Sequence, residues 1–121
     1  VDVGRFIEKH ITALDQLEVL LLVCALPDRE WSPEAVYQVV RTTPALVLKR
    51  LDEFVREGLL GRVGEPPLYR YAPRTEELAA QVSAVGAFYK MSRHKVVELI
   101  YSIPREPLTE FSEAFRFKRE K

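Results

Sequence analysis

The residues with chemistry of their own are few and lie far apart in the sequence. His94 and Glu98 stand four positions apart on a predicted helix, a spacing that could present two ligands to a metal ion. No third ligand accompanies them, so a solvated polar pair is the favoured interpretation. His10 also has no evident partner for a metal site. Cys24 is the single cysteine, and its apolar setting in Leu20–Leu26 favours a buried thiol that acts as a small hydrophobe.

The sequence lacks the motifs of the common enzyme classes. It has no phosphate-binding loop, no G-x-S-x-G nucleophile elbow and no dinucleotide-binding fingerprint. A single cysteine forms neither an internal disulfide nor a CxxC metal site. Trp31, Tyr69 and Tyr71 are expected to pack in the core and a hairpin rather than to form a ligand cage. We therefore expect a binding module and not an enzyme, with no cofactor and no metal.

Composition predicts one folded unit. The 121 residues are 47% hydrophobic, which is enough for a buried core in one domain, or in one domain with a helical extension. The 18 basic and 18 acidic residues balance, so overall charge gives no argument for a nucleic-acid partner. The apolar run Leu20–Leu26 is too short to span a membrane and no signal peptide is visible, so we expect a cytoplasmic protein.

Helix-start signals divide the first half of the chain. Residues 1–11 are predicted to form a short helix or arm, and Thr12–Asp15 resembles a capping box before a helix that Pro27 ends. Ser32–Glu34 has the residue types of an N-cap and first turn, which predicts a short helix. A similar start after two threonines predicts a helix over Pro44–Glu57.

A hairpin is predicted directly after this helix. Gly58 is placed to end the helix, and the helical spacing of apolar residues is then lost. Leu59–Gly64 and Leu68–Tyr71 are predicted to form two strands around a turn at Glu65–Pro67, and Pro73 closes the second one.

The rest of the chain is predicted to be helical. Thr75–Ser102 regains the helical spacing, although Gly86 or Ser92–His94 could bend or break it. Its apolar and small residues predict a homodimer through this segment, with packing on the first helix as the alternative. A last helix is predicted to dock through three apolar side chains: Leu108, Phe111 and Phe115.

The order of helix, short helix, helix, hairpin and long helix resembles the winged helix-turn-helix superfamily, most closely the MarR-type bacterial transcription regulators. Trp31–Val36 is similar to that family's opening of the helix before the turn. Thr43–Val47 and Leu51–Leu60 look like its recognition helix and the exit into the wing, with Phe54 in place of the second leucine. The likeness covers residues 12–73.

This resemblance implies a mainly α fold with a small β-hairpin wing. A winged helix-turn-helix domain would occupy residues 1–74, followed by a helical extension over 75–121. The recognition helix would lie at 44–57 and the wing at 59–72. Such proteins bind double-stranded DNA as homodimers with paired half-sites.

The candidate DNA contacts lie on the outward face of the predicted recognition helix, at its start, and on the wing. On a helical wheel Leu48 and Arg50 lie at the edges of the buried face. The outward residues are Ala45, Leu46, Lys49, Asp52, Glu53 and Arg56. Lys49 could reach a phosphate or a guanine, and Leu46 a thymine methyl group. The alternative is a solvated helix face with one stray leucine. The candidate residues are Thr42, Thr43, Ala45, Leu46, Lys49, Arg50, Arg62 and Arg70.

Two functions therefore remain open. Residues 29–74 carry eight basic and six acidic side chains, whereas residues 1–28 carry two and five, and this asymmetry favours a DNA-binding transcription regulator. Neutral net charge, an outward Leu46 and the acidic, proline-rich tip Glu65–Pro67 favour a protein-interaction module that does not bind DNA. Arg62 and Arg70 could contact the minor groove of DNA, or they could be ordinary exposed charges on a strand, and the sequence favours neither interpretation.

Overall fold

Six helices and one two-stranded antiparallel sheet make up residues 3–102, the part of the chain that this computed structural model describes. The mainly α fold with a small β-hairpin is therefore confirmed. No helix within residues 3–102 is both long and apolar enough to cross a membrane. The elements are α1 (Val3–His10), α2 (Leu14–Ala25), α3 (Pro33–Tyr37), α4 (Pro44–Arg56), β1 (Leu60–Val63), β2 (Leu68–Tyr71), α5 (Glu76–Met91) and α6 (Arg93–Ser102).

Hydroxyl side chains cap the starts of three helices. Ser32, Thr43 and Thr75 each accept a hydrogen bond from the backbone N–H three residues later, at 3.1, 3.2 and 3.1 Å. These bonds satisfy N–H groups that have no partner within the helix. The predicted starts of α3 and α4 are confirmed, and each has proline in its first turn.

The predicted capping box before α2 is wrong by one residue. The N-cap is Ala13, which has no side chain able to accept a hydrogen bond. Gln16 compensates, because its Oε1 accepts from the backbone N of Thr12 at 2.7 Å and from its Oγ1 at 3.1 Å. Asp15, which the capping box required, is thereby released to face α4, where it binds Arg50.

Gly58 ends α4 as predicted, because its φ of +81° is a conformation that side chains with a Cβ rarely adopt. The hairpin then pairs Leu60 with Tyr71 and Val63 with Leu68. An isolated bridge adds to its second strand: Trp31 N donates to Tyr69 O at 2.7 Å, and Tyr69 N donates to Trp31 O at 2.8 Å.

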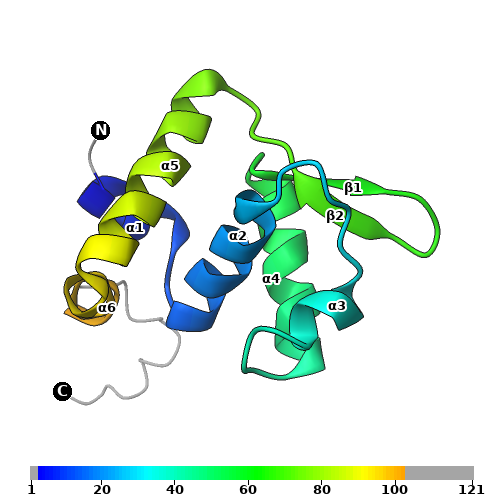
Figure 1. The fold of residues 1–121 in the computed structure, drawn as a ribbon, viewed down its shortest axis with the longest axis horizontal. Coiled ribbons are helices and arrows are strands. Elements are labelled where there is room, and N and C mark those ends of the chain that lie inside the picture. Colours follow the sequence, from blue (N-terminus) through cyan, green and yellow to red (C-terminus); the bar gives the residue numbers. More distant parts are fainter. Residues whose placement is uncertain (1–2, 103–121) are drawn as a thin grey trace, which may run out of the picture.

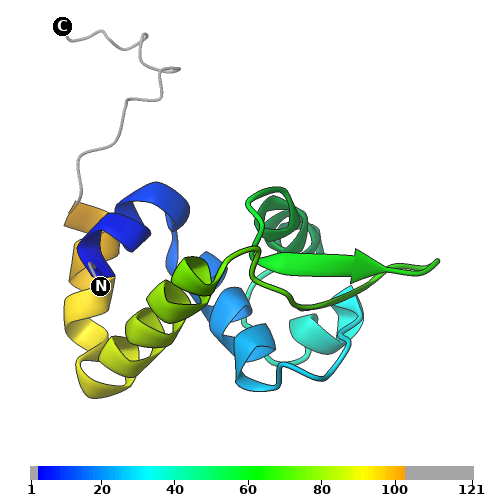
Figure 2. The same cartoon turned by 90° about the horizontal axis from the view of Figure 1, so that it is seen from above.

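α2 lies between two groups of elements (Figure 1). On one side of α2 the helices α1, α5 and α6 pack together, and on its other side lie α3, α4 and the hairpin. The hairpin projects away from the helices in both views (Figure 2). A single cluster of buried side chains runs through both groups. Its largest fully buried members include Phe6, Leu20, Phe54 and Tyr69.

The segment from Thr75 breaks at Ser92, within the polar stretch that the sequence singled out. Its apolar stripe is largely buried within the chain, on the helix pair itself and on α1: Val82, Val85, Val96 and Ile100 are at most 1% exposed. α1 packs on both α5 and α6. The predicted last helix, with Leu108, Phe111 and Phe115, lies outside the described residues.

Candidate functional site

α4 carries an exposed ridge of small and basic side chains. Ala45, Lys49 and Arg56 are all exposed and follow one line along the helix; we call these three residues the α4 ridge. Thr43, also exposed, precedes the ridge at the N-cap. The surface thus offers two cations beside a small side chain that leaves room for a close approach.

Asp52, expected on the outward face, is turned toward the hairpin instead. The buried Tyr69 donates its hydroxyl proton to Asp52 Oδ1 at 2.7 Å. Burial, this hydrogen bond and the charge of Asp52 together raise the pKa of Tyr69 to about 12, with the nearby Arg62 acting in the opposite direction. Asp52 is half-buried, and this hydrogen bond holds its carboxylate against the hairpin.

The other two acids of this region are also bound inside the molecule. Glu53 Oε1 accepts from Gln16 Nε2 at 3.4 Å, which corrects its expected outward position. Glu57, the C-cap of α4, places its Oε1 2.7 Å from Nδ1 of the buried His10. These contacts direct Glu53 and Glu57 away from the α4 ridge, whereas Asp52 lies between Lys49 and Arg56 along the helix and is bound by Tyr69.

Arg50, expected among the DNA contacts, lies inside the fold. Its side chain is 11% exposed, and its Nη2 donates to Asp15 Oδ1 at 3.2 Å while its Nη1 donates to Glu53 Oε1 at 3.5 Å. Arg50 Nε is buried and has no hydrogen-bond partner within the described residues. The helical wheel placed Arg50 at the edge of the buried face, and the first turn of α2 covers that edge. Arg50 therefore joins α4 to α2 and is not available to a ligand.

The two threonines before α4 already serve the fold. Thr42 Oγ1 donates to Asp15 Oδ2 at 3.1 Å, which uses the only proton of its hydroxyl. Thr43 Oγ1 accepts from the backbone N of Leu46, so its own proton stays available at an exposed position. Of the pair, only Thr43 retains a donor for an external oxygen atom.

The two leucines on the flanks of α4 exchange their expected roles. Leu46, expected to point outward, is half-buried, because it shares with Arg50 the flank that faces α2. Leu48, expected at the edge of the buried face, is 42% exposed. An apolar contact from α4 to a partner would therefore come from Leu48.

The two arginines of the hairpin point to opposite faces. Arg62 pairs with Tyr69 and Arg70 pairs with Gly61, and residues paired across two strands share a face. Both arginines are exposed. Because Tyr69 binds Asp52 on α4, only Arg62 lies on the face of the hairpin that is turned toward α4.

The residues with catalytic or metal-binding chemistry do not come together. His94 and Glu98 are both exposed on α6, and no group of three His, Cys, Asp or Glu side chains that could hold a metal ion occurs among the described residues. Cys24 is half-buried rather than fully buried. Burial raises the pKa of its thiol, and a hydrogen bond with Tyr71 partly offsets that effect.

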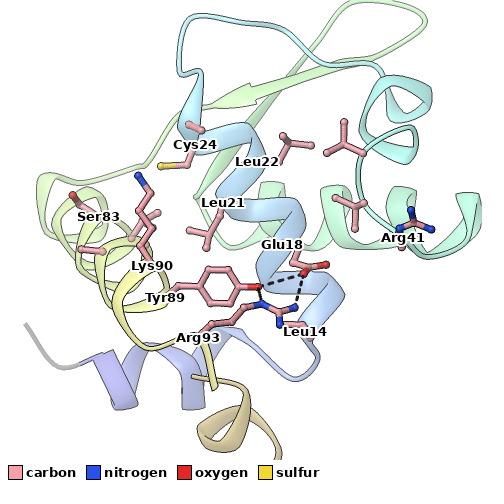
Figure 3. Close-up of a pocket in the computed structure, with 16 residues that line it drawn as sticks. Leu14, Glu18, Leu21, Leu22, Cys24, Arg41, Ser83, Tyr89, Lys90 and Arg93 are labelled. Carbon is pink, nitrogen blue, oxygen red and sulfur yellow. Dashed lines mark hydrogen bonds and ion pairs between the residues drawn. The ribbon is translucent and has the colours of Figure 1, made fainter. Parts of the chain in front are cut away.

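A second surface feature, absent from the sequence-based expectations, is an open trough along α2 (Figure 3). Its floor is the exposed side of α2, one wall is α5, and the other is the turn at residues 39–41. Its volume is about 1050 Å³, and we call it the α2 trough. At one end Glu18 Oε2 accepts from the Tyr89 hydroxyl at 3.3 Å and pairs with Arg93 Nη2 at 3.6 Å. Small side chains on α5, with Gly86 against Leu21, keep the trough open.

Comparison with known proteins adds information about the fold. No protein-family model and no curated protein matches this chain. Among solved structures, the crystal structure of RV1404 from Mycobacterium tuberculosis is similar, with a TM-score of 0.53 and 16% sequence identity. The match covers 95% of this chain and 80% of that one. At this identity the likeness extends to the fold and no further.

Proposed function

We propose that this chain is a DNA-binding transcription regulator of the winged helix-turn-helix type, with α4 as its recognition helix and the β1–β2 hairpin as its wing. The observation that carries the proposal is the distribution of charge on and around α4. Lys49 and Arg56 are exposed on the α4 ridge, whereas Asp52, Glu53 and Glu57 are bound to partners within the fold. A helix surface that keeps its cations outside and its anions inside suits a polyanion.

The proposed contacts follow from this geometry. Lys49 and Arg56 would meet phosphates or guanine edges in the major groove, and the exposed Ala45 would allow the backbone to approach closely. Thr43 would donate its hydroxyl proton to a phosphate at the start of the helix. Arg62 would contact the flanking backbone from the hairpin face that is turned toward α4. Arg50 and Thr42 have no part in this interface, because the Arg50 side chain is buried against α2 and Thr42 donates its hydroxyl proton to Asp15.

We also propose that the regulator is a homodimer through α5 and α6, which would present two copies of α4 to paired half-sites. Support comes from Met91 and Tyr101, which are 80% and 62% exposed, and from the exposed small residue Ala80. Sedimentation should give about twice the chain mass of 14.0 kDa at micromolar concentration. A single species at the monomer mass would remove the paired half-site arrangement but leave the α4 interface standing.

The deciding experiment is duplex binding measured by fluorescence anisotropy across a series of salt concentrations. Each lost phosphate contact reduces the salt slope by about 0.9, so we expect this change for Lys49→Ala and again for Arg56→Ala. Lys9→Ala is the matched control, since Lys9 is an exposed lysine on α1, outside both α4 and the hairpin. If Lys9→Ala lowers the salt slope as much as Lys49→Ala does, the attraction to DNA is diffuse and the assignment of the contact to α4 is overturned.

A second candidate is a protein-interaction module, and one observation favours it. Tyr37, Val39 and Leu48 are 41%, 57% and 42% exposed on α3, the following turn and α4. Large apolar side chains at that exposure are typical of protein interfaces. The absence of salt-dependent binding to any duplex would move the assignment to this candidate, for which Leu48→Glu should then abolish complex formation with the partner.

A further inference from the structure

The α2 trough is an apolar surface at the end of the described chain. α6 ends at Ser102, and the hydroxyl of Tyr101 accepts a hydrogen bond from the backbone N of Leu14 at 2.9 Å. Leu14 lines one end of the trough. The chain therefore leaves the described structure beside the trough and has 19 further residues, 103–121.

The length of these residues suits the trough. Residues 103–107 can span up to about 17 Å when extended, which brings Leu108 over the floor. The floor runs from Leu14 to Ala25 on α2, about 17 Å at the rise of an α-helix. In a helical conformation, Leu108 and Phe115 would lie about 10 Å apart along the axis, within that floor.

The side chains of residues 108–115 also complement those that line the trough. Leu108, Phe111 and Phe115 have the spacing of one helical face, and the floor offers them the side chains of Leu21 and Leu22. The charged residues lining the trough are Glu18, Arg41, Lys90 and Arg93, which sum to a net positive charge. Residues 108–115 contain two glutamates and no basic residue, so attraction between opposite charges favours the pairing.

From these observations we propose that residues 108–115 of the same chain fill the α2 trough, as an amphipathic helix that covers the half-buried leucines of α2. The basic end, from Arg116 onward, then stays in solvent. The segment binds α2, α5 and the turn at residues 39–41 at once, so it clamps the α3–α4 unit to the extension. This role is independent of whether α4 binds DNA.

The first test is hydrogen exchange of the full chain, read out over residues 108–115. We expect slow exchange of these amides in the unsubstituted chain and fast exchange in Ser83→Trp. Ser83 is an exposed residue of the α5 wall, so a tryptophan there fills the trough without touching the core. Glu77→Trp is the matched control, because Glu77 is exposed on the same helix but does not line the trough, and exchange should stay slow. Equal exchange in all three chains overturns the proposal.

The second test uses the single cysteine, because Cys24 lines the trough (Figure 3). Phe111→Ser combined with Phe115→Ser should speed labelling of the Cys24 thiol, and Phe117→Ser should not, since Phe117 lies off the apolar face. If the segment occupies the trough about nine-tenths of the time, release speeds labelling about tenfold, because only the open fraction reacts. An unchanged rate overturns the proposal.

The dependence of Cys24 labelling on protein concentration distinguishes a segment of the same chain from a second copy as the occupant of the trough. Protection of Cys24 by a segment of the same chain is independent of concentration. Protection that disappears on dilution would assign the trough to a second copy and overturn the intramolecular arrangement. Circular dichroism of each variant, compared with the unsubstituted chain, separates release of the segment from loss of the fold.

Discussion

Arg50→Ala provides the sharpest test of the α4 assignment. Arg50, Asp15 and Glu53 have side chains that are only 11%, 16% and 19% exposed, so removal of the guanidinium leaves two carboxylates in a poorly hydrated place without their cation. Breaking a fully buried ion pair costs about 3–5 kcal/mol. Asp15 keeps its hydrogen bond from Thr42, Glu53 keeps that from Gln16, and some water remains, so we expect a loss of about 2–3 kcal/mol here.

This loss is large enough to measure by urea unfolding. Trp31 is the only tryptophan and is 3% exposed, so its fluorescence reports on the core. For a chain of this size the loss corresponds to a fall in the melting temperature of about 8–12 °C. Lys49→Ala, on the exposed ridge of the same helix, should change stability by less than about 0.5 kcal/mol. The reasoning is refuted if Arg50→Ala unfolds like Lys49→Ala, and still more if it lowers the salt slope of DNA binding at unchanged stability.

Two further predictions concern the contacts around α4. The pKa of Tyr69 rises from 10.0 to about 12 on folding, so the neutral tyrosine stabilises the fold fully below pH 10, and this stability is lost as the pH rises to 12. Tyr69→Phe should therefore flatten the fall in unfolding free energy measured between pH 10 and 12. At neutral pH it should cost about 1–2 kcal/mol through the lost hydrogen bond to Asp52. Gly58→Ala should cost about as much as Gly64→Ala by thermal unfolding, since both have positive φ and an added Cβ at Gly58 meets, at 2.8 Å, only the guanidinium end of the flexible Arg74 side chain. A much larger cost at Gly58 that Arg74→Ala removes would show that the arginine cannot move aside, contrary to this expectation.

The parts of the fold that depend on short stretches of sequence were predictable. The caps at Ser32 and Thr43 are local, because each hydroxyl binds an N–H three residues away. Gly58 ends its helix through its own backbone conformation. The strands follow from a change in the spacing of apolar residues, and the break at Ser92 lies in a short polar stretch.

The candidate site was predicted less well, because it depends on which elements lie beside α4. A helical wheel orders side chains around one helix but does not reveal its neighbours. Arg50 and Asp15 are 35 residues apart, and the hydroxyl of Tyr69 reaches Asp52 from another element. The reversal of Leu46 and Leu48 has the same origin. The α2 trough had no local signal, since it forms where α2, α5 and the turn before α4 meet.

The bridge between Trp31 and Tyr69 also affects self-association through backbone pairing. A two-stranded sheet has two open edges, and each unpaired N–H and C=O is a template for a strand of another molecule. Trp31 bonds to both backbone groups of Tyr69 and thus closes the middle of the β2 edge. β1 is only four residues long and carries the exposed Arg62, which discourages a neighbouring strand. The hairpin can therefore extend from the helices and remain accessible without acting as a site for aggregation.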